Sequence, residues 1–173
     1  MQVIVIEDRQ VANFMPLVGL KPVYGLFSGT MSLKERFDIA AGGKIRLTWH
    51  VRGHLAPYFA ESNPGATVNT ILDEDLLLLN GRLVCDDRVI DLATDSHLQV
   101  GQALMQEGDL VACRLRSSDL VLDDGLMPDL IDTGKLAGTL SCVETSGFTL
   151  LRQIWDPVAL HPQLMQLDRS RFR

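Results

Sequence analysis

Cysteine is scarce in this 173-residue sequence. Cys85, Cys113 and Cys142 stand alone, with no Cys-x-x-Cys pair and no histidine at metal-ligand spacing. This pattern argues against a disulfide framework or a zinc site and predicts reduced, mostly buried thiols. With 46% hydrophobic and 22% charged residues, a chain of this length can bury a normal core without such cross-links. We therefore expect one domain over residues 1–173.

The chain also lacks a net positive charge and long hydrophobic runs. The net charge is -6 and the pI is about 5.1, which argues against broad contact with nucleic acid or an anionic membrane. The N-terminal sequence MQVIVIEDR has no basic region followed by a long apolar stretch, and no segment is long enough to span a bilayer. We expect a cytoplasmic protein with neither partner, in which a few local arginines can still hold a small anion.

A G-x-G-x-x-G fingerprint is missing after the first β-rich run, which argues against a Rossmann-type oxidoreductase. What is present is an alternation of β-rich runs and helical patterns. We expect strands at residues 2–6, 45–51, 76–79, 110–116, 139–144 and 148–154. We expect helices at 32–41, 55–60, 96–107 and 155–173, and a hairpin or loop with a short helix within 117–136. The alternation predicts an α/β, Rossmann-like, doubly wound and mostly parallel sheet.

The long loop after the first strand carries the first family pattern. Residues 6–18 read I-E-D-R-Q-V-A-N-F-M-P-L-V, and Pro22 follows closely. Sugar nucleotidyltransferases read roughly L-A-G-G-x-G-T-R-L-x-P-L-T at this place, followed by P-K-P. The longer pattern aligns without a gap on Pro16 and Leu17, and Pro22 then falls on the first proline of P-K-P. The run LLLLNGRLV at 76–84 is similar to their V-L-V-L-N-G-D-V strand and turn. The chain thus resembles the sugar nucleotidyltransferases, which implies the nucleotide-diphospho-sugar transferase type of fold.

Along most of its length, the chain also resembles a divergent bacterial branch of that fold. Its loop P-L-T-x-T-R-P-V, helix G-x-x-x-x-x-E-x-W, strand end N-G-R and late W-D element correspond here to residues 16–23, 29–37, 80–82 and 155–156. In that branch a left-handed β-helix of hexapeptide repeats usually follows the domain. This chain stops at Arg173, so we expect a single nucleotidyltransferase-like domain without the β-helix. The alternative function is a non-catalytic interaction or regulatory domain of a hexapeptide-repeat sugar acyltransferase.

The chain departs from the enzymes' full motif at the positions that carry charge. Asp8, Arg9 and Val11 replace the glycines that cradle phosphates. Asn13 replaces the arginine that stabilises pyrophosphate, and Val23 replaces the lysine that holds the sugar phosphate. Arg82 replaces the aspartate that holds Mg²⁺. Mg²⁺ binding is therefore possible but is not supported by the usual carboxylate position, and transferase activity is left undecided.

The resemblance implies a nucleoside triphosphate or sugar phosphate as ligand. The candidate ligand-binding residues are Asp8, Arg9, Asn13, Lys21, Asn80, Gly81 and Arg82. Ligands bind at the carboxyl ends of strands in such sheets, and three of these side chains, Arg9, Lys21 and Arg82, could converge there. Glu7 or Asp8 could hold a metal at the same edge.

Each candidate also has a structural interpretation. Residues 7–9 could form a surface turn with local ion pairs, and Lys21 could be solvated. Arg82 could form a salt bridge with Asp86 or Asp87.

Overall fold

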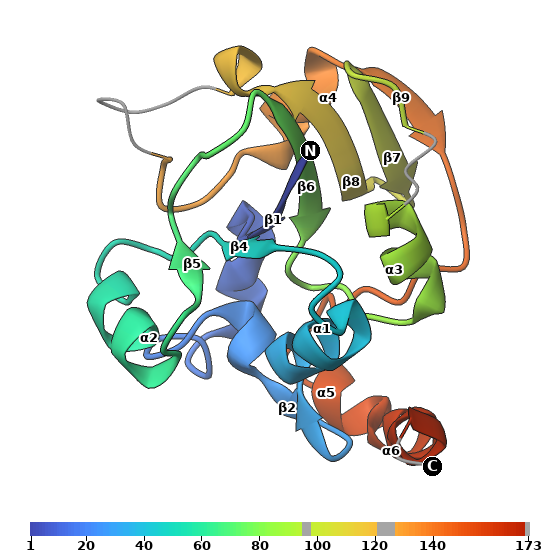
Figure 1. Cartoon of the computed structure of the whole chain (residues 1–173). Helices are drawn as coiled ribbons and strands as arrows, with labels where there is room; N and C mark the ends of the chain where they lie inside the picture. Colours follow the sequence, from blue (N-terminus) through green and yellow to red (C-terminus); the bar gives the residue numbers. More distant parts are fainter. Residues whose placement is uncertain (95–97, 121–126, 172–173) are drawn as a thin grey trace.

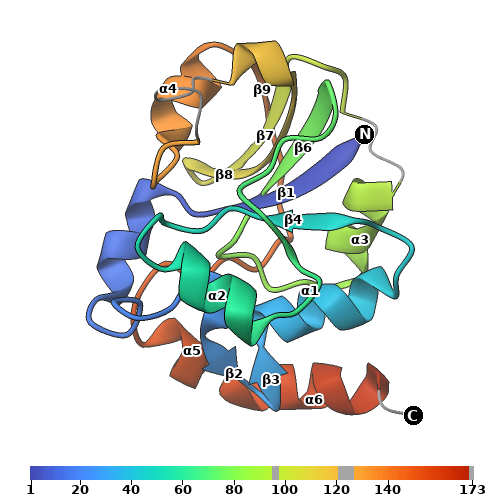
Figure 2. The same cartoon turned by 60° about the vertical axis from the view of Figure 1, so that its left-hand side comes forward.

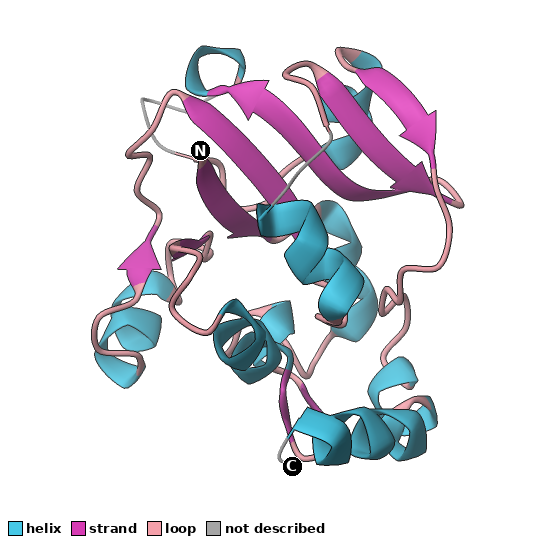
Figure 3. Ribbon diagram, turned by 45° about the vertical axis from the view of Figure 1, so that its right-hand side comes forward, coloured by secondary structure: helices cyan, strands magenta, loops and turns pink. Residues whose placement is uncertain are grey.

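The computed structural model describes residues 1–94, 98–120 and 127–171. Its main feature is a seven-stranded sheet in the order β5-β4-β1-β6-β8-β7-β9. The strands are β1 (Gln2–Ile6), β4 (Leu47–Trp49), β5 (Thr67–Val68), β6 (Asp75–Asn80), β7 (Gln102–Gln106), β8 (Asp109–Arg116) and β9 (Ser141–Glu144). Only the pairings made by β8 are antiparallel, so the sheet is mostly parallel, as expected. Figure 3 shows these strands forming one twisted sheet.

Helices cover both faces of the sheet (Figures 1 and 2). The α-helices are α1 (Leu33–Ala41), α2 (Ala56–Ser62), α3 (Asp87–Thr94), α4 (Thr133–Gly138), α5 (Asp156–Ala159) and α6 (His161–Arg171). Short 3-10 helices are η1 (Arg9–Phe14), η2 (Val23–Gly25) and η3 (Ser117–Asp119), and β2 (Phe27–Ser28) pairs with β3 (Met31–Ser32). Within the described residues, no helix is long and apolar enough to cross a membrane.

The two central strands explain where the core lies. Every residue of β1 is buried, and side chains alternate between faces along a strand. One core contains Val3, Val5, Leu77 and Leu79 with residues of α1, α2 and α3, and the other contains Ile4, Ile6, Leu76 and Leu78 with Leu136 of α4. Continuous apolar runs are typical of strands that are covered on both faces. The strand ends that carry the candidate residues therefore emerge from the middle of the sheet.

Two secondary-structure predictions are wrong. Residues 102–106 form β7 instead of part of a helix at 96–107, and residues 95–97 lie outside the described residues. The turn explains the strand: Glu107 (φ 53°) and Gly108 (φ 82°) both have positive φ, as a two-residue turn between antiparallel strands requires. Residues 148–154 form no strand and contribute only an isolated bridge between Leu83 and Leu150. Helix α3 was not predicted.

The C-terminal helices are attached to the β2–β3 hairpin. Asp168 of α6 is fully buried and accepts hydrogen bonds from Arg36 and from the backbone and hydroxyl of Thr30, the latter two at 2.8 Å. The Ser28 hydroxyl donates to the Pro157 carbonyl. Figure 1 shows α5 and α6 beside β2. The predicted helical tail is confirmed for α5 and α6, while residues 172–173 lie outside the described residues.

Candidate functional site

The ends of β1 and β6 bring distant residues together. Ile6 lies beside Asn80 in the parallel pairing, so the residues that follow these two strands meet at one edge of the sheet. The Gly81 amide donates to the Ile6 carbonyl at 2.8 Å. A Cβ atom on Gly81 would lie only 2.7 Å from that oxygen and 2.8 Å from a ring carbon of Tyr24. Glycine at position 81 therefore allows the two strand ends to approach each other.

Arg82 is buried among protein acceptors at this edge. It is 1% exposed, and its Nη2 lies 2.7 Å from both Asp8 Oδ2 and Asp109 Oδ1. Its Nε also donates to Asp8, and its Nη1 donates to the Leu151 carbonyl at 3.0 Å. Burial alone would lower the pKa of Arg82, but the hydrogen bonds and charges of Asp8 and Asp109 raise it. The guanidinium is thus a permanently charged internal group, paired with Asp8 and Asp109 and not with Asp86 or Asp87, the alternative partners in the sequence.

Asp8 is equally enclosed, with no exposed surface. Its Oδ1 accepts from the Gln10 amide at 3.1 Å, which caps η1. Its Oδ2 accepts from Asn80 Nδ2 at 2.9 Å in addition to Arg82. Both carboxylate oxygens are therefore already used by N–H donors of the protein.

A second buried ion pair fixes the long loop after β1. Glu7 has no exposed surface, and its Oε1 accepts from the Val23 amide at 2.7 Å. Arg52 lies 3.0 Å from Glu7 Oε2 and also donates to the carbonyls of Val18 (2.6 Å) and Lys21 (2.9 Å). Burial raises the pKa of the Glu7 carboxyl, whereas the nearby Arg52 charge lowers it. These contacts fix the backbone of the loop and leave the Lys21 side chain exposed.

His50 connects this edge to the segment 127–132. Its Nδ1 accepts from the Glu7 amide at 3.2 Å, so its Nε2 carries the proton and donates to the Pro128 carbonyl at 2.7 Å. Burial lowers the pKa of His50, although the Pro128 hydrogen bond and the Asp129 charge oppose that shift. The Ile131 amide also donates to the Glu7 carbonyl at 2.9 Å. The contacts of His50 are those of a structural residue.

Comparison with known proteins identifies the chain at the family level. The model of the family described as "Sugar nucleotidyl transferase" matches residues 3–173. The chain belongs to this family. A crystal structure from Bacillus anthracis that carries the name glucose-1-phosphate thymidylyltransferase, in complex with sucrose, superposes with a TM-score of 0.59. It covers 96% of this chain and 95% of its own chain at 10% identity, so this likeness supports the fold alone. No curated protein sequence gave a significant match.

The family to which the chain belongs typically uses Mg²⁺, but the strand-end residues of this chain do not suit that ion. Mg²⁺ requires near-octahedral oxygen ligands. The Asp8 oxygens already accept four N–H groups, two of them from Arg82, and are therefore not free to ligate a cation. Across the described parts of the chain, no cluster of three or more histidine, cysteine, aspartate or glutamate side chains is arranged to hold a metal. The residues at the strand ends are therefore not arranged as Mg²⁺ ligands.

The seven predicted site residues fall into two groups. Asp8, Asn80, Gly81 and Arg82 meet in the buried cluster described above. The other three side chains are exposed: Arg9 lies 3.0 Å from Asp132, Asn13 donates to Gln10 and to the Arg152 carbonyl, and Lys21 borders a hollow formed with α1 and α2. The expected convergence of all three basic side chains on one crevice is therefore not seen in these contacts.

Sequence reasoning missed Asp109 and Arg52, which neutralise the buried charges. Asp109 opens β8, and it lies near the β1 and β6 ends only because β8 runs antiparallel to β6. The Glu107-Gly108 turn between two β-rich runs was the available signal for that reversal. No comparable local signal in the sequence points to Arg52 as the partner of Glu7.

Proposed function

We propose that this chain binds a nucleotide or sugar phosphate but does not transfer nucleotidyl groups by the metal-dependent route of its family. The observation that carries this proposal is the Arg82–Asp8 ion pair. It occupies the β6 end, where the resemblance to the enzymes places a metal-binding aspartate. A guanidinium cannot ligate a cation.

The charge balance of the cluster supports the loss of chemistry. Catalysis of phosphoryl transfer depends mainly on positioning and on electrostatic stabilisation of developing negative charge. Arg82 bonds to Asp8, Asp109 and the Leu151 carbonyl, so its charge is already compensated inside the protein. A triphosphate at this edge would meet neither a metal ion held by a carboxylate nor a free arginine from this position.

Ligand binding rests on family membership and on the exposed cations of the predicted set. Arg9 begins η1, and its exposed side chain is paired with the partly exposed Asp132. Lys21 forms no ion pair with any described residue, and its backbone is fixed by Arg52. A free, exposed cation on a fixed backbone can bind a phosphate without first giving up an internal partner.

The test is thermal unfolding of the full chain with a panel of nucleoside triphosphates and sugar 1-phosphates, each in Mg²⁺ and in EDTA. A ligand that binds only the folded state raises stability by about 2.7 kcal/mol at one hundred times its Kd. We expect a shift with at least one ligand in EDTA, and no pyrophosphate release when ligands are combined in Mg²⁺. Absence of any shift would overturn the binding proposal, and metal-dependent pyrophosphate release would overturn the loss of transfer.

Two variants with a matched control identify the cation involved. Arg9→Ala and Lys21→Ala each remove one exposed candidate. The control, Arg116→Ala, removes an exposed arginine at the end of β8 that belongs to no candidate site. The ligand-induced shift should fall in one of the first two variants and persist in Arg116→Ala. An equal loss in all three would indicate nonspecific attraction to positive charge.

A further inference from the structure

A hollow of about 470 Å³ lies between α1, α2 and the loop that carries Lys21. Three large apolar side chains on its border are unusually exposed: Leu20 at 82%, Tyr58 at 66% and Phe27 at 62%. Large exposed apolar groups that gather around one concave surface mark binding sites more often than isolated ones do. This hollow is therefore a candidate ligand site apart from the buried ion pairs.

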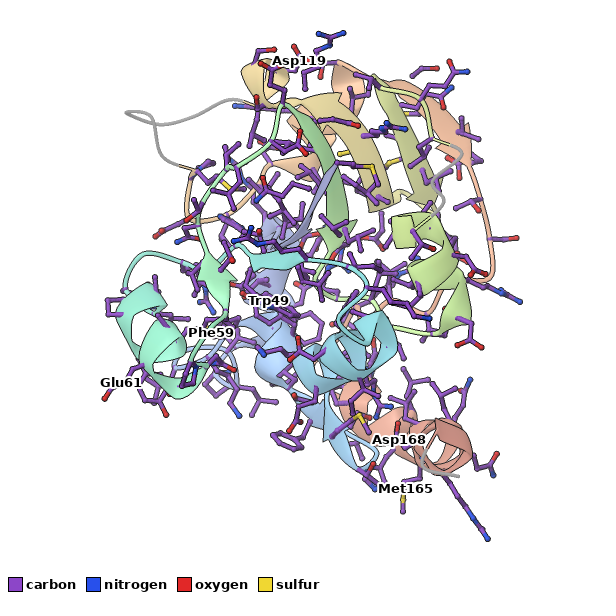
Figure 4. The ribbon with its side chains drawn as sticks, viewed as in Figure 1. Trp49, Phe59, Glu61, Asp119, Met165 and Asp168 are labelled. Atoms are coloured by element: carbon purple, nitrogen blue, oxygen red, sulfur yellow. The ribbon has the colours of Figure 1, made fainter. Side chains whose placement is uncertain are left out.

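One wall of the hollow is formed by Phe59, whose ring packs against an aromatic cluster in the core. Phe59 of α2 lines the hollow and is 6% exposed. Its ring centroid lies 6.4 Å from that of Trp49 and 5.8 Å from that of Tyr24, and Figure 4 labels Phe59 and Trp49 in this region. Asn63 Nδ2 donates to the Phe59 carbonyl at 2.8 Å at the end of α2. A ligand would thus meet a preformed wall, which lowers the entropic cost of binding.

Two lysines and one glutamate line the hollow, and Lys21 is the one that a ligand anion could pair with. Lys34 lies 5.1 Å above the Trp49 ring and is paired with Asp38 at 2.6 Å. Glu35 is the acid that lines the hollow; its hydrogen bonds to Ser32 lower its pKa, so it stays ionised. Lys21 has no acidic partner among the described residues and therefore remains available to a ligand phosphate.

We infer that this hollow binds a nucleoside phosphate, with the base stacked on Tyr58 and Phe27 and the phosphate beside Lys21. This inference rests on the proposed function and names its ligand class and place. Aromatic side chains stack on bases of any sequence, and lysine is a common phosphate-binding residue. The exposed rings of Tyr58 and Phe27 favour a nucleoside phosphate over a sugar phosphate, because a base can stack on them.

Isothermal titration calorimetry with UTP, ATP and glucose 1-phosphate, in EDTA, tests the inference on the full chain. Lys21→Ala and Tyr58→Ala should each weaken nucleotide binding about tenfold or more. The matched controls are Lys44→Ala and Trp155→Ala, which remove an exposed lysine and a 62% exposed aromatic that do not line the hollow. These controls should bind as the wild type does. All four positions are exposed, and circular dichroism checks that each variant is folded.

The outcomes separate the two proposals. If the wild type binds none of the three probes, this inference fails, and the proposed function fails with it if the wider panel also shows no binding. If UTP or ATP binds but neither Lys21→Ala nor Tyr58→Ala weakens it, the hollow is excluded while the proposed function stands. If only glucose 1-phosphate binds and depends on Lys21, the ligand class inferred here is overturned.

Discussion

Replacing Arg82 with methionine distinguishes a structural role from a ligand-binding role. Methionine keeps similar length and volume but removes every contact of the guanidinium with Asp8, Asp109 and the Leu151 carbonyl. The Asp8 carboxylate, with no exposed surface, would then keep only Asn80 and the Gln10 amide as donors. Breaking a buried ion pair by removing one partner costs about 3–5 kcal/mol. We expect a loss of that size in the free energy of unfolding, measured in urea at pH 7.

The comparison variant for this experiment is Arg9→Met. The Arg9–Asp132 pair has a similar separation of 3.0 Å, but the Arg9 side chain is 67% exposed. Exposed ion pairs contribute about 0–1 kcal/mol, so Arg9→Met should change stability little. The double variant Asp8→Asn/Arg82→Met should be less destabilised than the sum of its single variants, because neither charge is then left alone. A loss below about 1 kcal/mol in Arg82→Met would refute the structural role of this pair.

Three further predictions concern Asp168, His50 and Gly81. Asp168→Asn removes the charge opposite Arg36 and should lower the free energy of unfolding by about 3–5 kcal/mol. Amide hydrogen exchange in α6 should become faster, and unchanged exchange there would show that this pair does not anchor the helix. Burial lowers the pKa of His50, so its stabilising contribution is complete above the unfolded value of 6.5 and is lost as the pH falls below it. Urea unfolding at pH 7 and pH 5 should show this loss, at most about 1.4 kcal/mol per pH unit, and His50→Gln should flatten it; an equal slope in both proteins would contradict the assignment. Gly81→Ala places a Cβ atom 2.7 Å from the Ile6 carbonyl oxygen and should lower the free energy of unfolding, measured in urea, by about 1–3 kcal/mol. An unchanged free energy of unfolding would show that the strand ends can separate.

Much of the fold could be predicted because its signals are local. The helix α1 begins at the Ser32–Glu35 capping box and ends at Gly42, which adopts the left-handed conformation. The apolar run at 76–79 becomes β6 in the middle of the sheet. The strand β7 could not be separated from a helix in the same way, because a short apolar pattern fits both and pairing with β8 decides the outcome.

The site was less predictable because its partners come from distant strands. Arg82 could be expected to need a carboxylate, and Asp86 and Asp87 were the nearest in the sequence. Its actual partners are Asp8, which is 74 residues away, and Asp109. Choosing between these partners requires the strand order and the direction of β8, which no local pattern specifies. Asp8, Asn80, Gly81 and Arg82 lie near one another because β1 and β6 are parallel neighbours whose ends meet at the same edge of the sheet.

The most direct test of the account is calorimetric titration of the full chain with one nucleoside triphosphate that stabilises it, first in Mg²⁺ and then in EDTA. Because Asp8 at the end of β1 is paired with Arg82 and its oxygens are occupied by N–H donors, we predict binding in EDTA with an affinity within about threefold of that in Mg²⁺. Binding that requires Mg²⁺ would contradict the account, because it would show that the strand ends, or another part of the site, still hold the metal.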